Sequence, residues 1–208
     1  MSSPPKKHFS MLRSFALADL ITLANAGCGA GSIFCCLRYL AAGSRNSLWV
    51  AIGLLPLAVV CDFFDGAVAR WRQKHSALGA DLDSLADIVS FGVAPAVLAF
   101  TLGLRGAWDV AILIYFVACG ISRLARYNAT AEALSDGAGK VSHYEGTPIP
   151  TSLALVIMLA VALALGRVEQ QLWWGRVTLL GGDWHPLSGL FAVSGSAMIS
   201  GTLRIPKP

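Results

Sequence analysis

Charged residues are scarce in this chain of 208 residues, where Lys, Arg, Asp and Glu make up 13% of the sequence and apolar residues make up 55%. A typical soluble domain is about 25% charged, because its surface must be hydrated. The composition therefore excludes an ordinary soluble fold of this size. It also excludes disorder, which requires low hydrophobicity and high net charge. The long apolar runs instead predict a multi-pass membrane protein built from α-helices.

Cysteine is sparse as well, and no two cysteines have the spacing that is typical of metal ligands. The five cysteines lie in apolar segments without C-x-x-C pairs, which predicts buried thiols rather than disulfides or a zinc site. The net charge of +4 does not indicate a nucleic-acid partner, because the basic residues are spread between the apolar runs and form no basic face.

Six apolar stretches are predicted to be transmembrane helices. They cover residues 19–41, 48–70, 84–103, 107–127, 149–166 and 186–203. The segment before them, residues 8–15, mixes basic and apolar residues and could form a short helix in the headgroup region. We therefore expect an all-α membrane protein, with a cytosolic or interfacial segment at 1–18 and one transmembrane domain at 19–208.

The distribution of Lys and Arg orients these predicted spans. Six spans put both termini on one side of the membrane, together with the loops after the second and fourth spans. That side holds eleven Lys or Arg residues, and the opposite side holds five. Because positively charged loops stay in the cytosol, both termini are predicted to be cytosolic.

Two pairs of aspartates lie near the predicted cytosolic ends of adjacent spans. Asp62 and Asp65 share one helical face, and Asp83 and Asp87 share a face of the next helix, which we expect to begin at Asp83. A charge at this depth costs about 2.5–3.5 kcal/mol, and like charges repel, so the carboxylates must be protonated or accompanied by cations. Aspartate oxygens suit Mg²⁺, Mn²⁺ or Ca²⁺. Four of them could hold two such ions about 3.5–4 Å apart and neutralise a pyrophosphate.

Small residues beside the aspartates leave two interpretations open. Gly66 and Ala69 lie on the face of Asp62, where they would let a bulky ligand approach the backbone, although small residues also permit close helix packing. Acidic residues within a span are equally found on proton or ion pathways, so an ion-coupled membrane transporter is the alternative from a different class. A transporter does not explain why all four acids crowd near one membrane face.

Eight positions over 26 residues match, without a departure, the signature of the CDP-alcohol phosphotransferases: Asp62-x₂-Asp65-Gly66-x₂-Ala69-Arg70-x₈-Gly79-x₃-Asp83-x₃-Asp87. The chain is identified as a member of that family by this resemblance. The resemblance implies six transmembrane helices, a homodimer and a cytosolic site in which the four aspartates hold two divalent cations. These would be Mg²⁺ or Mn²⁺, with Ca²⁺ as an alternative in one site. It further implies that an acceptor hydroxyl displaces CMP, with Asp87 as proton acceptor.

Further stretches of the chain resemble the phosphatidylserine synthases within this family. They are residues 83–96, 119–128 and 145–151, and residues 202–208 resemble the fungal branch. The resemblance implies that the phosphatidyl group of CDP-diacylglycerol is transferred to L-serine, giving phosphatidylserine and CMP, in the endoplasmic reticulum membrane. Inositol or glycerol 3-phosphate is the alternative acceptor, since nearby basic residues would also suit a phosphate.

The same resemblance implies which residues contact CDP-diacylglycerol: Thr22, Asn25, Gly66, Ala69, Arg70 and Ser76. An asparagine in a span can also simply bond a neighbouring helix. For serine the candidates are Arg123 and Arg126, because a guanidinium binds a carboxylate through two parallel hydrogen bonds. Membrane anchoring explains these arginines equally well. Asn128 and Thr147 complete the predicted serine site.

Overall fold

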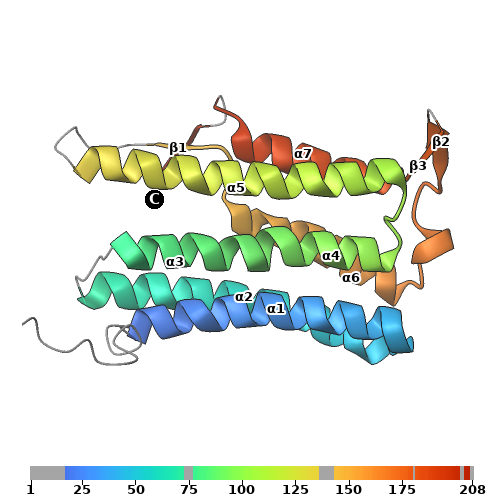
Figure 1. The fold of residues 1–208 in the computed structure, drawn as a ribbon, viewed down its shortest axis with the longest axis horizontal. Coiled ribbons are helices and arrows are strands. Elements are labelled where there is room, and N and C mark those ends of the chain that lie inside the picture. Colours follow the sequence, from blue (N-terminus) through green and yellow to red (C-terminus); the bar gives the residue numbers. More distant parts are fainter. Residues whose placement is uncertain (1–16, 73–76, 136–142, 180, 202–203, 207–208) are drawn as a thin grey trace, which may run out of the picture.

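The computed structural model describes residues 17–72, 77–135, 143–179, 181–201 and 204–206, and it is a bundle of long helices with short strands at both ends (Figure 1). The α-helices are α1 (Leu17–Ala42), α2 (Arg45–Arg72), α3 (Ala77–Asp87), α4 (Ala94–Leu102), α5 (Ala107–Ser135), α6 (Leu153–Ala164) and α7 (Gly189–Ile199). The predicted interfacial helix lies almost entirely outside the described residues. The all-helical prediction for the membrane-embedded part agrees with this bundle.

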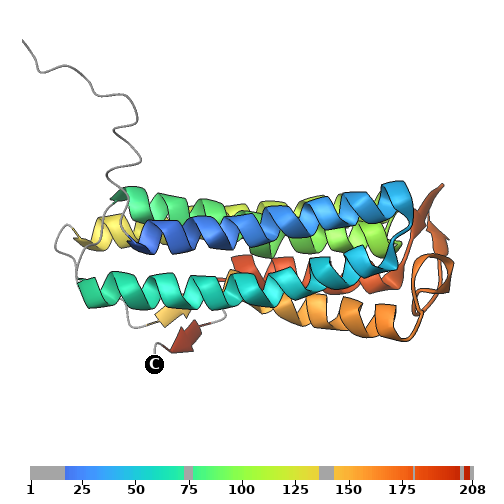
Figure 2. The same cartoon turned by 90° about the horizontal axis from the view of Figure 1, so that it is seen from below.

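Shorter elements connect and extend these helices. A π-helix, η1 (Ile88–Val93), joins α3 to α4, and 3₁₀ turns η2 (Ile149–Ser152), η3 (Glu169–Gln171) and η4 (Pro186–Ser188) lie around α6 and before α7. The antiparallel strand pairs are β1 (His143–Glu145) with β4 (Arg204–Pro206), and β2 (Val177–Leu179) with β3 (Gly182–Trp184). Figure 2 shows that β4 lies toward the end of the bundle at which α1 begins.

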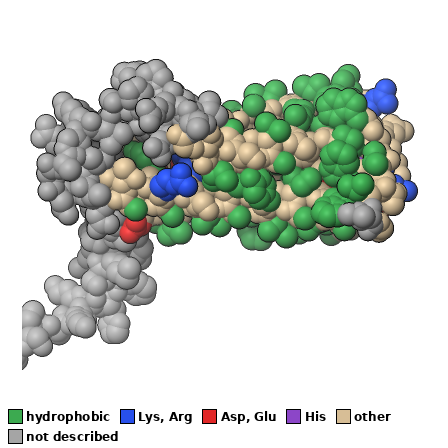
Figure 3. Space-filling model, turned by 90° about the horizontal axis from the view of Figure 1, so that it is seen from above, with side chains coloured by type: hydrophobic (Ala, Val, Ile, Leu, Met, Phe, Trp, Pro, Cys, Tyr) green, Lys and Arg blue, Asp and Glu red, His purple; other side chains and the backbone are tan. Residues whose placement is uncertain are grey.

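All six predicted apolar stretches are mainly helical, and four of the helical segments are long and apolar enough to cross a membrane. Those four are Ala18–Ala42, Arg45–Val68, Gly79–Leu102 and Ala107–Thr130. Ile149–Ala164 and Pro186–Ile199 are shorter apolar helices. Large apolar side chains such as Phe34 and Ile114 are exposed. On the face in Figure 3, hydrophobic side chains cover much of the described surface, and few Lys or Arg side chains are seen. This surface suits a lipid environment.

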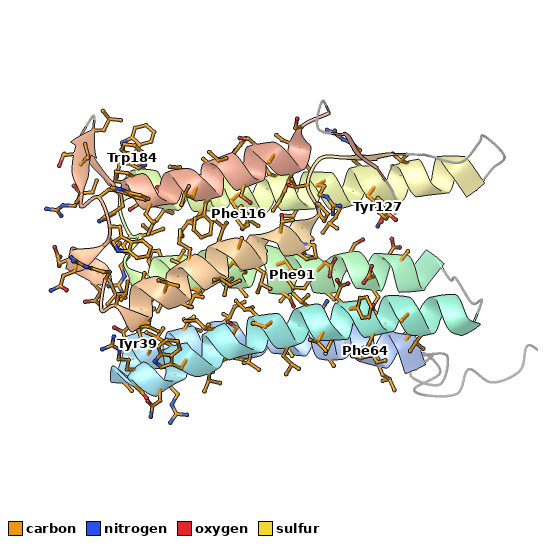
Figure 4. All side chains as sticks on the ribbon, turned by 180° about the vertical axis from the view of Figure 1, so that it is seen from behind. Tyr39, Phe64, Phe91, Phe116, Tyr127 and Trp184 are labelled. Carbon is orange, nitrogen blue, oxygen red and sulfur yellow. The ribbon has the colours of Figure 1, made fainter. Side chains whose placement is uncertain are left out.

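The interior of the bundle is filled by aromatic and aliphatic side chains. Phe116 of α5 and Phe191 of α7 pack edge to face with ring centroids 5.3 Å apart, which is a favourable geometry for two aromatic rings. Phe91 of the π-helix is also fully buried. Figure 4 shows Phe91 and Phe116 inside the bundle, with Tyr39 and Trp184 at one end and Phe64 and Tyr127 toward the other.

The helix that carries Asp83 begins earlier than predicted. The sequence pattern led us to expect a helix start at Asp83, but α3 begins at Ala77 and therefore places Asp83 well inside the helix. No proline separates the two positions, and a helix propagates readily once its first turn has formed. Both aspartates of α3 therefore stand on a continuous helical face.

Candidate active site

Three of the predicted aspartates converge at one end of the bundle. Asp62 of α2 and Asp83 and Asp87 of α3 each offer one carboxylate oxygen within 4.8 Å of the other two. Asp87 is buried, and the other two are partly buried. Asp83 Oδ1 is buried without a hydrogen-bond partner among the described residues. Because an unpartnered buried carboxylate oxygen is costly, this cluster, Asp62–Asp83–Asp87, is suited to bind a cation.

The fourth aspartate, Asp65, has a different partner. Its Oδ2 accepts a hydrogen bond of 2.8 Å from Thr22 Oγ1 of α1, and the side chain is 5% exposed. Asp65 is not in the group of oxygens that lie within 4.8 Å of one another. The structure thus brings three of the four predicted ligands together and holds the fourth, one helical turn from Asp62, against α1.

Helix α1 also contacts the cluster through Asn25. Asn25 Nδ2 donates a hydrogen bond of 3.1 Å to Asp87 Oδ1, and Ser90 Oγ donates one of 2.8 Å to the Asn25 carbonyl oxygen. Asn25 therefore does bond a neighbouring helix, as one interpretation of its sequence position suggested. Both contacts join residues more than 60 positions apart in the chain.

Asp87 is followed directly by the π-helix, Ile88–Val93. Such helices are rare and occur frequently at functional sites, because the extra residue in the turn redirects the side chains around it. The turn packs closely on α1, where a Cβ atom placed on Gly29 would lie 2.7 Å from Ser90 Cα. The sequence analysis missed Gly29, although the small residues at positions 26–31 were a signal for a close helix contact.

The remaining residues predicted for CDP-diacylglycerol lie on or after α2. Gly66 is partly buried beside Asp65. Ala69 and Arg70 belong to α2, but their side chains lie outside the described set, and so does Ser76.

The residues predicted for serine lie on α5 and on the segment before α6. Arg123 is partly buried and Arg126 is exposed. Asn128 exchanges two hydrogen bonds, of 2.9 and 3.2 Å, with the hydroxyl group of Ser84, the neighbour of Asp83. Ser84 is a second residue that the sequence analysis missed, although it lies within the aspartate motif.

Thr147 is bonded to a different helix, because its backbone nitrogen donates to the carbonyl oxygen of Ala197 on α7. Gly146 precedes it with φ +76°, a conformation that glycine adopts without strain. The structure therefore ties Asn128 to α3, beside the acidic cluster, and ties Thr147 to α7.

A helical membrane bundle with clustered carboxylates at one end is compatible with a membrane enzyme that binds divalent cations. The comparisons with known proteins identify the family. Residues 15–182 match the family model of the CDP-alcohol phosphatidyltransferases. The chain belongs to the CDP-alcohol phosphatidyltransferase family.

Similar proteins include the CDP-diacylglycerol–serine O-phosphatidyltransferase of Saccharomyces cerevisiae, which is 43% identical over 206 residues, or 97% of this chain and 74% of the yeast protein. The Mycobacterium bovis protein of the same name is 32% identical over 151 residues, covering 71% of this chain and 51% of that protein. An archaetidylserine synthase from Methanothermobacter thermautotrophicus is 37% identical over 144 residues, covering 68% and 56%. The chain thus spans three quarters of the yeast relative and about half of the other two.

Proposed function

We propose that this protein transfers the phosphatidyl group of CDP-diacylglycerol to L-serine, giving phosphatidylserine and CMP. The observation that carries the proposal is the cluster of Asp62, Asp83 and Asp87 oxygens, which stand at the acidic positions of the family signature. The yeast and mycobacterial relatives are serine O-phosphatidyltransferases, which supports serine as the acceptor here.

Asp62, Asp65, Asp83 and Asp87 would hold two divalent cations, Mg²⁺ or Mn²⁺, with Ca²⁺ as an alternative in one site. The residues fit such ions, because carboxylate oxygens are the donors that hard cations prefer and Asp83 Oδ1 has no partner within the described part of the chain. When bound, the cations neutralise the pyrophosphate and favour in-line displacement at phosphorus.

The protein's own contribution to the reaction centres on Asp87. The serine hydroxyl oxygen forms a bond to the phosphorus next to diacylglycerol, and the bond from that phosphorus to the oxygen of the leaving CMP breaks. Asp87 accepts the proton of the hydroxyl group as general base. Asn25 donates to Asp87 Oδ1 and so restricts the direction in which this carboxylate points.

The lipid part of the substrate would remain in the bilayer while its headgroup reaches the site. Phe63 and Phe64 lie between Asp62 and Asp65 on α2 and are 67% and 54% exposed, so the helical turn that carries these carboxylates also presents apolar surface for the acyl chains. This arrangement supports a site at the lipid boundary rather than one in a soluble domain.

The remaining parts of the proposal concern ligand contacts and the setting of the enzyme. Thr22, Asn25, Gly66, Ala69, Arg70 and Ser76 would contact CDP-diacylglycerol, and Arg123, Arg126, Asn128 and Thr147 would contact serine. We further propose six membrane crossings, a homodimer, and placement in the endoplasmic reticulum membrane with both termini and the site facing the cytosol. Accessibility of terminal tags, compared with the loop around Trp173, tests this topology.

Release of CMP by the purified protein tests the reaction. CDP-diacylglycerol is supplied with serine, inositol or glycerol 3-phosphate in parallel assays, each with and without excess chelator. We expect release with serine alone, loss of release with chelator, and recovery after Mn²⁺ or Mg²⁺ is added. CMP release with inositol alone would show that inositol, and not serine, is the acceptor. CMP release in excess chelator would contradict the metal-dependent mechanism.

A further inference from the structure

Helix α1 supplies none of the clustered carboxylates, yet it is bonded to one of them. We propose that Asn25 is a positioning residue for Asp87: its side-chain amide orients the carboxylate for cation binding, and the packing of α1 on the π-helix holds that amide in place. Only the catalytic consequence of this inference rests on the proposed function.

The hydrogen-bonding of Asn25 indicates a positioning role. The residue is fully buried, and its Nδ2 donates to Asp87 Oδ1 at 3.1 Å. Its Oδ1 is buried with no partner in the described part of the chain, so the bond to Asp87 is what sets the direction of the amide. The two oxygens of a carboxylate lie in one plane, so a bond to one oxygen also limits where the other can lie. Groups that orient metal ligands in this way control metal affinity.

The packing between α1 and the π-helix provides the rigid support that such a role requires. Ser90, three residues after Asp87, donates to the Asn25 carbonyl oxygen at 2.8 Å. A Cβ atom on Gly29 would lie 2.6 Å from Ser90 Oγ and 2.7 Å from Ser90 Cα, so a larger residue would push the π-helix away from α1. A Cβ on Gly27 of the same helix would meet nothing within 4 Å. Gly27 therefore offers a matched control for a substitution at Gly29.

A positioning role and direct nucleotide binding by Asn25 predict different effects. Loss of a group that orients a metal ligand typically weakens metal binding about 10- to 100-fold. Loss of a nucleotide contact would instead raise the KM for CDP-diacylglycerol and leave metal binding unchanged. Binding of Mn²⁺ alone therefore separates the two roles and requires no turnover.

The experiment compares N25A, S90A, G29A and the control G27A in the full-length protein purified in detergent. Free Mn²⁺ is measured by electron paramagnetic resonance during titration, and thermal unfolding without metal reports folding. We expect Mn²⁺ binding to weaken about 10- to 100-fold in N25A and G29A, less in S90A, and to stay unchanged in G27A. S90A adds no volume, so it tests the packing even where G29A fails to fold.

The kinetic readout extends the test to the reaction. In N25A the Mn²⁺ concentration for half-maximal activity should rise, and this rise is expected whether or not loss of the proposed contact between Asn25 and CDP-diacylglycerol also raises the KM for that substrate. Unchanged Mn²⁺ binding in folded N25A overturns the inference. This holds if the KM for CDP-diacylglycerol rises, and it holds if only the unfolding temperature falls. If the wild type binds Mn²⁺ more tightly than N25A but releases no CMP with any acceptor, the inference stands and the proposed function fails.

Discussion

Two buried aspartates at opposite ends of the bundle differ in how their charges are satisfied. Asp109, in the first turn of α5, is fully buried. Its carboxylate accepts from the backbone nitrogens of Gly106 at 2.9 Å and His185 at 2.8 Å, and it lies 2.6 Å from His185 Nδ1. Asp87 instead accepts one hydrogen bond from Asn25 and faces two further carboxylates.

This difference leads us to expect a structural role for Asp109 and a functional role for Asp87. Asp109 joins the start of α5 to the segment before α7, and its oxygens are occupied by groups of the protein itself. The cluster of Asp62, Asp83 and Asp87 brings acceptors together without enough donors, which is unfavourable for folding unless a cation balances it. Removing Asp109 should therefore damage stability, whereas removing Asp87 should damage activity.

The largest expected effect is on catalysis by D87N. This change removes a proton acceptor and a carboxylate donor, so CMP release should fall about 10²- to 10⁴-fold. The unfolding temperature should not fall, because one like charge leaves the cluster. The matched control is D81N, since Asp81 is exposed on the same helix and lies outside the signature. A D87N protein that keeps normal turnover would show that the cluster is not the active site.

The next effect is on stability, in D109A. Losing the carboxylate leaves the backbone nitrogens of Gly106 and His185 without their acceptor and removes the contact with the His185 ring. Each buried donor left unpaired costs about 1–3 kcal/mol. Thermal unfolding in detergent measures the loss. Turnover per folded molecule should remain near wild type, because Asp109 lies at the end of the bundle away from the cluster. A selective loss of turnover without loss of stability would contradict the comparison.

A smaller effect is expected on serine affinity in R126A and R123A. If either guanidinium binds the serine carboxylate, its loss removes about 1.5–3 kcal/mol, which raises the KM for serine roughly ten- to hundredfold. R126K and R123K keep the positive charge but lose the two parallel hydrogen bonds of a guanidinium, so they should keep part of the affinity for serine. Initial rates at varied serine test this. Unchanged serine KM in all four variants would identify the arginines as membrane anchors.

The smallest effect is expected from breaking a solvent-exposed ion pair. Arg176 and Asp183 form an ion pair of 3.1 Å near the β2–β3 hairpin, and both side chains are more than one third exposed. Exposed pairs contribute less than about 1 kcal/mol because water and salt screen them. R176Q should therefore barely change the unfolding temperature. A loss as large as that of D109A would mean that charge pairing, rather than burial, stabilises this end.

Local periodicity was sufficient for much of the site. The apolar helices and the shared helical faces of the aspartates were predictable, because they depend on apolar length and on residues three or four positions apart. The same reasoning misplaced the start of α3, since helix ends depend on packing as well as on local sequence.

Tertiary structure alone decided how the aspartates are satisfied. The bonds from Thr22 to Asp65 and from Asn25 to Asp87 join residues 43 and 62 positions apart, and the pairing of Asp109 with His185 spans 76. No periodicity connects such positions, because they meet only when separate helices pack. The sequence therefore determined which carboxylates the protein has in its membrane helices. Only the packing of α1, α3 and α5 against their neighbours decided which of them accept hydrogen bonds from other segments of the chain and which gather in the cluster of Asp62, Asp83 and Asp87.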